Sequence, residues 1–257
     1  QKCALRPPIT LRRIVNDSLS LVAADLGVAM GVSGTEVAKE AADMVLMDDN
    51  FGSIIEAIKE GRNIYKTTKK VILYLFSTSL GEVLVIGVSI AIGLPLPLIA
   101  AQIIWLNLVT DGFLDISIAM EHREKDILSE KKVTAKLLDK LMIFRMFVMA
   151  FPMMIGGIIV FSSYLNDGLI KAWTMSLTTL AVFQWLNAWN SRHELKSVFS
   201  LPIRNNWYLL MATGVVIILQ CFAVYHPFMQ SILKTEAISL FDWFVAVSVG
   251  SSIVFVE

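Results

Sequence analysis

Six apolar stretches, each near the length of one membrane crossing, fill the sequence from residue 71 to its end. A helix needs about 20 mostly apolar residues to cross a bilayer. Hydrophobic residues make up 56% of the chain and charged residues 17%, below the roughly 25% of soluble domains. The sequence therefore predicts a mostly α, polytopic bundle of six transmembrane helices in a lipid bilayer. They are approximately residues 71–93, 98–120, 142–164, 172–190, 206–228 and 239–256.

Basic residues indicate the orientation of this bundle, since Lys and Arg concentrate in the cytoplasmic loops of membrane proteins. They precede the first stretch and fill the loops after the second and the fourth, whereas the alternate loops hold little more than Lys171 and Lys234. Both termini are therefore expected in the cytoplasm, and the expected membrane is the plasma membrane. The net charge is zero, and no nucleic acid is expected as a partner.

Residues 15 to about 62 have a different pattern, in which short strands alternate with helices. "LGVAMG" (26–31) and "DMVLMDD" (43–49) are typical of buried strands, and "TEVAKEAA" (35–42) of a helix capped at its start. Such alternation indicates a parallel α/β unit. The segment is too short for a whole domain and no strand opens it, so we expect a partial α/β segment ahead of the bundle.

Acidic and amide side chains interrupt the first two apolar stretches. Glu82 lies near the middle of the first, and Asn107 and Asp111 lie four residues apart on one helix face of the second, which Asp115 extends. An ionised group at this depth costs at least about 2.5–3.5 kcal/mol, so it needs a partner, water or an ion. Oxygen ligands suit hard cations such as Ca²⁺, Mg²⁺ or Na⁺. Glu82, Asn107, Thr110 and Asp111 are therefore a candidate cation site.

Other polar residues near these stretches leave two interpretations open. Hydroxyl groups such as those of Thr78 and Ser79 serve either as ligands or as hydrogen-bonding contacts between helices. Asp115 is either a further ligand or the partner of a basic group. Glu194, just past the fourth stretch, is either a ligand or a solvated charge beside Arg192.

Two long blocks of the sequence resemble parts of a known family. The first is "VNDSLSLVAADLGVAMGVSGTEVAKEAADMVLMDDNFGSIIEAIKEGR", and the second is "GEVLVIGVSIAIGLPLPLIAAQIIWLNLVTDG". The first resembles the end of the phosphorylation domain of P-type ATPases, the cation pumps that form an aspartyl-phosphate. The second resembles the fifth and sixth transmembrane helices of their calcium-pump-like branch. The resemblance implies that the chain has three parts. Residues 1–14 match nothing in the family and are not native to it. Residues 15–62 are the end of a HAD-like (Rossmann-like) phosphorylation domain, and residues 63–257 are a transmembrane domain.

The resemblance also implies roles for single residues. Asn16 and Asp17 match the pump hinge motif, which lies close to the phosphorylated aspartate and its Mg²⁺. Glu82 matches the fifth-helix acid of the cation site, and Glu194 falls where such pumps place an eighth-helix acid. The sixth-helix ligands are matched by Asn107, Thr110 and Asp111, and Ser79 stands where calcium pumps have an asparagine, which leaves the identity of the cation open.

The pattern of the family is incomplete in this sequence. Arg13 stands in place of the Mg²⁺-binding acid, and no Asp-Lys-Thr-Gly is present, so we find no catalytic residue here. The nucleotide-binding domain, the actuator domain and the first four membrane helices have no counterpart, and an N-terminal half of the pump is the expected partner. Mg²⁺ and ATP are expected as cofactors of the full-length pump, with Ca²⁺ or another hard cation as its cargo. This chain alone is expected to bind none of them tightly and to be inactive.

An alternative function uses the same carboxylates without phosphorylation. In that interpretation the chain is a non-enzymatic membrane module, either a channel or a regulatory or complementing subunit. An upstream reading frame that encodes Asp-Lys-Thr-Gly would favour the pump.

Overall fold

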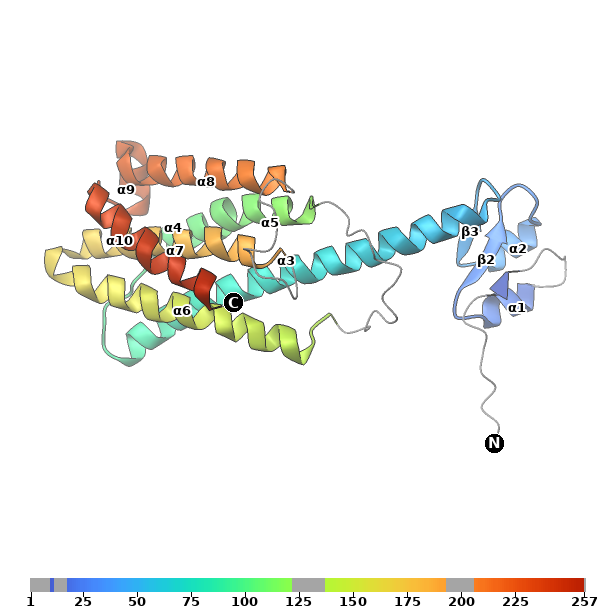
Figure 1. Cartoon of the computed structure of the whole chain (residues 1–257), viewed down its shortest axis with the longest axis horizontal. Helices are drawn as coiled ribbons and strands as arrows, with labels where there is room; N and C mark the ends of the chain where they lie inside the picture. The colour runs from blue at the N-terminus through green and yellow to red at the C-terminus, as the bar shows by residue number, and fades with distance from the viewer. Residues whose placement is uncertain (1–9, 12–17, 122–136, 193–205, 257) are drawn as a thin grey trace, which may run out of the picture. The chain divides into compact units, whose positions relative to one another are not determined.

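The computed structural model describes residues 10–11, 18–121, 137–192 and 206–256, and the chain divides into two compact units (Figure 1). The first runs to Asn63, and the second comprises most of the chain from Ile64 onward.

The first unit is a small parallel sheet with connecting helices. Its elements are β1 (Thr10–Leu11), α1 (Ser18–Ala23), β2 (Gly27–Met30), α2 (Glu36–Ala41) and β3 (Met44–Leu46). The strand order is β1-β2-β3 and both pairs are parallel. The two predicted strands and the predicted helix are confirmed. A further strand, β1, precedes the segment 15–62 and pairs with β2 through Thr10 opposite Gly27.

Polar side chains hold the turns of this unit. Thr35 caps α2 and accepts a hydrogen bond from the backbone N–H of Ala38 at 3.3 Å, as the capping pattern predicts. Asp49 adopts the left-handed conformation, with φ 49°, and its carboxylate accepts the backbone N–H groups of Val32 and Ser33 at 2.9 and 2.8 Å. A hydrogen bond from the Ser33 side chain, followed by the backbone N–H groups of Val32 and Ser33, lowers the pKa of Asp49. The turn after β3 is therefore tied to the turn after β2.

The second unit is helical, and one long helix, α3 (Phe51–Ala91), leads into it. After a turn at Gly93, where φ is 79°, the chain continues as a helix with a π-helical segment at its centre. The remaining elements are α4 (Ala100–Trp105), η1 (Leu106–Asp111), α5 (Gly112–Ala119), α6 (Lys140–Tyr164), η2 (Leu165–Asp167), α7 (Leu169–Asn190), α8 (Trp207–Tyr225), α9 (Pro227–Leu233), α10 (Leu240–Gly250) and η5 (Ser251–Phe255).

The most buried helix of this unit is α7, which packs against α6 and α10 (Figure 1). Glycines allow close approach: a Cβ at Gly156 of α6 would lie 2.8 Å from the Phe183 ring, and one at Gly250 of α10 would lie 2.5 Å from Val182. Most α7 side chains contact protein on every side, so this helix carries polar residues that a lipid-facing helix would not.

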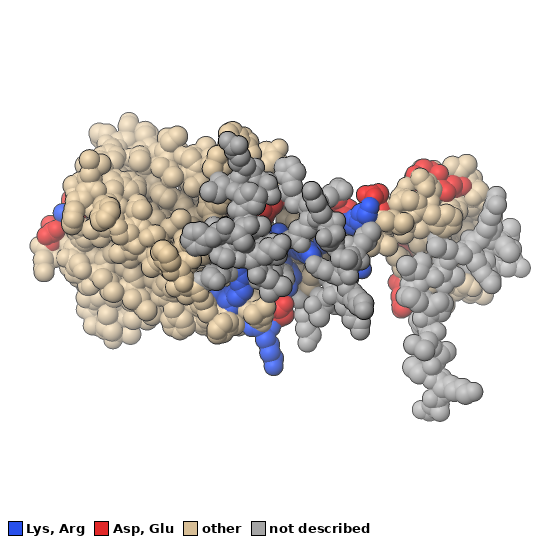
Figure 2. Space-filling model, viewed as in Figure 1, with Lys and Arg blue, Asp and Glu red and all other residues tan. Residues whose placement is uncertain are grey.

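The chain is an integral membrane protein with a mostly helical fold. Among the described residues, three helices are long and apolar enough to cross a membrane, namely Phe51–Ala91, Lys140–Asp167 and Trp207–Tyr225, and Leu240–Phe255 is a shorter apolar helix. The visible face of the helical unit is almost uncharged over most of its length, with Lys and Arg gathered towards one end (Figure 2). The predicted stretch 206–228 breaks at Tyr225, because His226 caps a new helix that Pro227 begins.

Candidate cation-binding site

Glu82 of α3 is a buried carboxylate held by two amide groups. Its side chain is 5% exposed. Oε2 accepts a hydrogen bond from Asn107 Nδ2 of η1 at 2.9 Å, and Oε1 accepts one from Gln184 Nε2 of α7 at 2.8 Å. Three helical segments distant in sequence therefore meet at this one acidic side chain.

Asp111, the second carboxylate, is bonded to the preceding part of α3. It is 1% exposed, and Oδ1 accepts the hydroxyl of Tyr74 at 2.7 Å. Thr78 Oγ1 lies 3.3 Å from Oδ2. Because Asn107 and Asp111 both bond to α3, they do project to the same neighbour, as their spacing predicts.

The π-helical segment η1 contains three of the four main predicted ligands, Asn107, Thr110 and Asp111. A π-helical turn inserts one residue into an α-helix, shifts the backbone hydrogen bonds from i→i+4 to i→i+5, and occurs mostly at functional sites. Thr110 is 2% exposed, whereas Asn107 is exposed beside its bond to Glu82. The apolar periodicity of this stretch gives no sign of the π turn, so the sequence alone did not predict it.

A second row of amides on α7 borders the site. Asn187 Nδ2 donates to Ser77 Oγ of α3 at 2.7 Å, one α7 turn from Gln184. Within the described part of the chain, the carbonyl oxygens Gln184 Oε1 and Asn187 Oδ1 are buried without a hydrogen-bond partner. Sequence reasoning missed both as site residues, although the spacing of Gln184, Asn187 and Asn190 places them near one helix face and was the available signal.

The remaining predicted site residues have mixed placements. Ser79 is exposed on α3, and Asp115 is half-buried, with Oδ1 lacking a partner among the described residues. Asn16, Asp17 and Glu194 lie outside the described residues. Within the described ranges, no three His, Cys, Asp or Glu side chains gather closely enough to hold a metal ion. Any cation held here would therefore depend on neutral oxygens as well as on Glu82 and Asp111.

Ion pairs at the basic end of the helical unit fix the helices that carry the site. Arg192, which follows α7 and is 2% exposed, donates from Nε to Glu121 Oε1 at 2.9 Å. Lys70 Nζ of α3 lies 3.7 Å from the other oxygen of Glu121, and Lys69 Nζ lies 3.0 Å from Asp139 at the start of α6. These contacts connect α3 to the ends of α5, α6 and α7, and so help to position Glu82 relative to Gln184.

Comparison with known proteins identifies relatives over most of the chain. Residues 95–257 match the family model described as "Cation transporting ATPase, C-terminus". The chain is 38% identical over 243 residues to "Calcium-transporting ATPase" of Bacillus subtilis. The aligned region covers 92% of this chain and 27% of that protein. It is 36% identical over 247 residues to "Calcium-transporting ATPase type 2C member 1" of Mus musculus, covering 95% and 27% respectively. The chain thus spans about a quarter of the length of these relatives.

Proposed function

Because this chain belongs to the cation-transporting ATPase family and corresponds to the C-terminal region of calcium-pump-like P-type ATPases, we propose that it is the part of an ATP-driven pump that carries one wall of the transmembrane cation site. Glu82, Asn107, Thr110 and Asp111 are the proposed ligands. Ser79, Asp115 and Glu194 are proposed as further contributors. Ca²⁺ is the cargo suggested by the names of the relatives, and oxygen-only ligands suit any hard cation.

The observation that carries this proposal is the pair of buried carboxylates on neighbouring helices. Glu82 and Asp111 are 5% and 1% exposed, and their hydrogen-bond partners among the described residues are amides and hydroxyls, with no Arg or Lys. Two buried acids without a basic counter-ion repel each other and are costly in a membrane. A bound cation offsets that cost, and a change in its affinity is how a pump picks up and releases its cargo.

The exposed face of α3 supports a site that other helices complete. Phe76, Ser79 and Val83 lie on one exposed stripe of α3, and Asn107 is exposed beside it on η1. Polar side chains that face lipid are disfavoured, so Ser79 and Asn107 are expected to be covered by protein. The first four membrane helices of a pump are the proposed cover and the proposed source of the remaining ligands.

The wider architecture is part of the same proposal. In this proposal, residues 15–62 are the end of a HAD-like phosphorylation domain, and residues 63–257 form a transmembrane domain of six helices. The domain spans the plasma membrane, and both termini lie on its cytoplasmic side. The parallel sheet β1-β2-β3 and the basic residues at one end of the helical unit support these assignments. In the whole pump, Mg²⁺ and ATP would act at the phosphorylation domain, near Asn16 and Asp17. The continuous helix α3 would carry the resulting movement to Glu82.

A chimera tests the proposal. This chain replaces the matching region of the Bacillus subtilis calcium-transporting ATPase, and phosphoenzyme formation from ATP is measured against Ca²⁺ concentration. We expect Ca²⁺-dependent phosphorylation that Glu82→Gln or Asp111→Asn abolishes. Asp167→Asn is the matched control, since Asp167 is 52% exposed and pairs with Lys171 at 3.1 Å, away from the site. Unchanged Ca²⁺ dependence in both site variants would remove these residues from the site. Cation flux through this chain alone in liposomes, without ATP, would instead favour a channel.

A further inference from the structure

The helix that carries three of the proposed ligands is held by α8 on both sides of its π-helical turn. Trp105, the residue before η1, donates from Nε1 to Gln220 Oε1 of α8 at 3.1 Å. Beyond η1, the backbone oxygen of Ser117 in α5 accepts from Nδ2 of Asn206, the cap of α8, at 3.2 Å. Both distances are ordinary for an N–H···O hydrogen bond. Contacts from one neighbouring helix therefore lie on either side of the segment Leu106–Asp111.

The two side chains that make these contacts are buried. Gln220 is 1% exposed and Asn206 is 0% exposed. A buried amide is costly in a membrane helix unless it is hydrogen-bonded. The oxygen of Gln220 accepts from Trp105, and its Nε2 lies 3.3 Å from Thr178 Oγ1 of α7. The Gln220 amide therefore lies between η1 and α7, the two segments whose amides donate to Glu82.

A π-helical turn makes the direction of the ligands depend on how its ends are held. The turn contains one residue more than the α-helix it interrupts. Adjacent residues of an α-helix differ in direction by about 100°, since about 3.6 residues make one turn. Suppose that η1 relaxed to an α-helix while Asp111 kept its bond to Tyr74. The residues before the extra one would then rotate by about 100°, and Asn107 would no longer face Glu82. The bond from Trp105 opposes this rotation.

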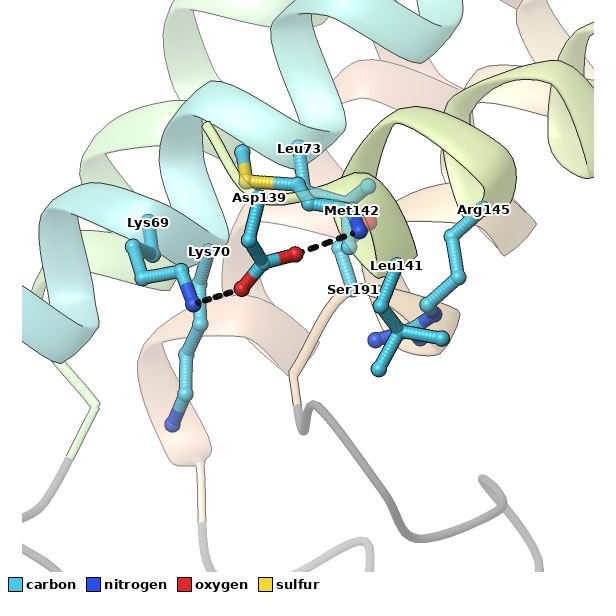
Figure 3. Close-up of a pocket in the computed structure, with 8 residues that line it drawn as sticks. All are labelled: Lys69, Lys70, Leu73, Asp139, Leu141, Met142, Arg145 and Ser191. Carbon is cyan, nitrogen blue, oxygen red and sulfur yellow. Dashed lines mark hydrogen bonds and ion pairs between the residues drawn. The ribbon is translucent and has the colours of Figure 1, made fainter. Parts of the chain in front are cut away.

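Other contacts leave the start of η1 to this hydrogen bond. Ile104 and Leu108 are 62% and 72% exposed, so one side of the helix is open in this chain. At the basic end of the helical unit, Lys69 Nζ lies 3.0 Å from Asp139 and so joins α3 to α6 (Figure 3). That ion pair does not involve η1. The direction of the residue before η1 therefore depends on Gln220.

We propose that Gln220 is a positioning residue of the cation site. By holding Trp105, it keeps η1 in the π-helical form in which the Asn107 side chain faces Glu82. This inference rests on the proposed function, since it assigns Gln220 an effect on a cation bound between α3 and η1. Gln220 does not touch that cation and acts on it only through the direction of Asn107.

Hydrogen–deuterium exchange of the purified full chain in detergent tests the positioning itself. Gln220→Met removes both polar atoms and keeps a side chain of similar length. We expect backbone amide exchange in residues 105–112 to become about tenfold faster, the effect of one lost buried hydrogen bond on local opening. Gln220→Glu keeps an oxygen that accepts the Trp105 N–H, so it is expected to restore most of the protection. Thr235→Val is the matched control: Thr235 is 6% exposed and donates to the Ala223 oxygen of α8 at 2.7 Å, away from η1.

Directly excited Tb³⁺ tests the consequence for the site. Its luminescence lifetimes in H₂O and in D₂O report how much water remains bound to the ion. In the full chain with Gln220→Met we expect weaker Tb³⁺ binding and a shorter lifetime in H₂O than in wild type, because water takes the position of the Asn107 oxygen. Thr235→Val is expected to leave both quantities unchanged.

The two measurements separate this inference from the proposed function. Unchanged exchange in residues 105–112 of Gln220→Met would overturn the inference. So would an increase spread evenly over all helices, which is a loss of stability alone, or faster local exchange with wild-type Tb³⁺ affinity and lifetime. If the wild-type chain bound no Tb³⁺, the proposed cation site would fail, and the exchange rates would still support or overturn the hold of Gln220 on η1.

Discussion

Removing one hydroxyl group, in Tyr74→Phe, tests whether Asp111 is held by α3. The substitution keeps the ring, and it deletes the donor that lies 2.7 Å from Asp111 Oδ1. Thr78 Oγ1 remains, but at 3.3 Å from Oδ2 it is beyond the usual range of an O–H···O hydrogen bond. Asp111 would then lose its main hydrogen bond within the described residues, at a side chain that is only 1% exposed.

The expected loss follows from burial and distance. Interhelical hydrogen bonds in membrane proteins contribute on average about 0.6 kcal/mol, with a maximum near 1.7 kcal/mol. Tyr74 and Asp111 are 0% and 1% exposed, and a distance of 2.7 Å is typical of a hydroxyl bound to an ionised oxygen. We therefore expect the upper end, a loss of about 1.5 kcal/mol in the free energy of unfolding.

The assay is equilibrium unfolding of the full chain in mixed micelles with increasing dodecyl sulfate, followed by tryptophan fluorescence. Tyr164→Phe is the matched control, since Tyr164 donates to Asp242 Oδ1 at 2.8 Å but is only half-buried. Asp242 also keeps its bonds from Ser239, at 2.9 and 2.8 Å. The control is expected to lose no more than about 0.6 kcal/mol. If Tyr74→Phe lost no more than Tyr164→Phe, the assignment of Tyr74 as the main support of Asp111 would be refuted.

Two further predictions concern helix packing and pH. Gly250→Val should lower the free energy of unfolding by about 1–3 kcal/mol, because a Cβ at position 250 would lie 2.5 Å from Val182. Gly214→Ala should raise the free energy of unfolding by about 0.5–1 kcal/mol, because a Cβ at position 214 has nothing within 4 Å and alanine favours the helix over glycine. Thermal unfolding in detergent measures both variants. If the unfolding midpoints of both variants shifted in the same direction, the packing described for these two glycines would be contradicted. The pKa of Asp139 is lower in the folded than in the unfolded chain. Ionised Asp139 therefore stabilises the folded chain fully above about pH 4, and this contribution to the free energy of unfolding disappears as the pH falls through the folded pKa. The difference in unfolding midpoint between wild type and Asp139→Asn should therefore be present at neutral pH and vanish in acid.

Much of the fold follows from local patterns. Apolar runs near twenty residues place the long helices, and the predicted stretch 142–164 differs from α6 (Lys140–Tyr164) by two residues at its start. The capping role of Thr35 was predictable because a hydroxyl before a helix is a local signal. The strand β1 was not predictable from the sequence. It has only two residues, which are too few to show a periodicity, and it depends on pairing with β2.

The candidate site was predictable where it depends on unusual residues and unpredictable where it depends on contacts. Glu82 and Asp111 are conspicuous because acids are rare in apolar stretches, and their burial is visible only in the packed structure. Gln184 makes its stretch less apolar and so weakens the sequence signal for a membrane span, yet it donates to Glu82 at 2.8 Å. An amide on a buried central helix and one on a lipid-facing helix look alike in sequence, since the difference is set by which helices surround it.

Cation binding by this chain is the most direct test of the central claim, that Glu82, Asn107, Thr110 and Asp111 form one wall of a hard-cation site. Tb³⁺ imitates Ca²⁺ and luminesces when a nearby tryptophan is excited, and Trp105 immediately precedes η1. We predict weak, saturable luminescence, with a dissociation constant of about 10⁻³ M or above since one wall alone is present. Ca²⁺ should displace the signal, and Glu82→Gln with Asp111→Asn should abolish it, while Asp167→Asn should not. A titration unchanged in the double variant would contradict the account.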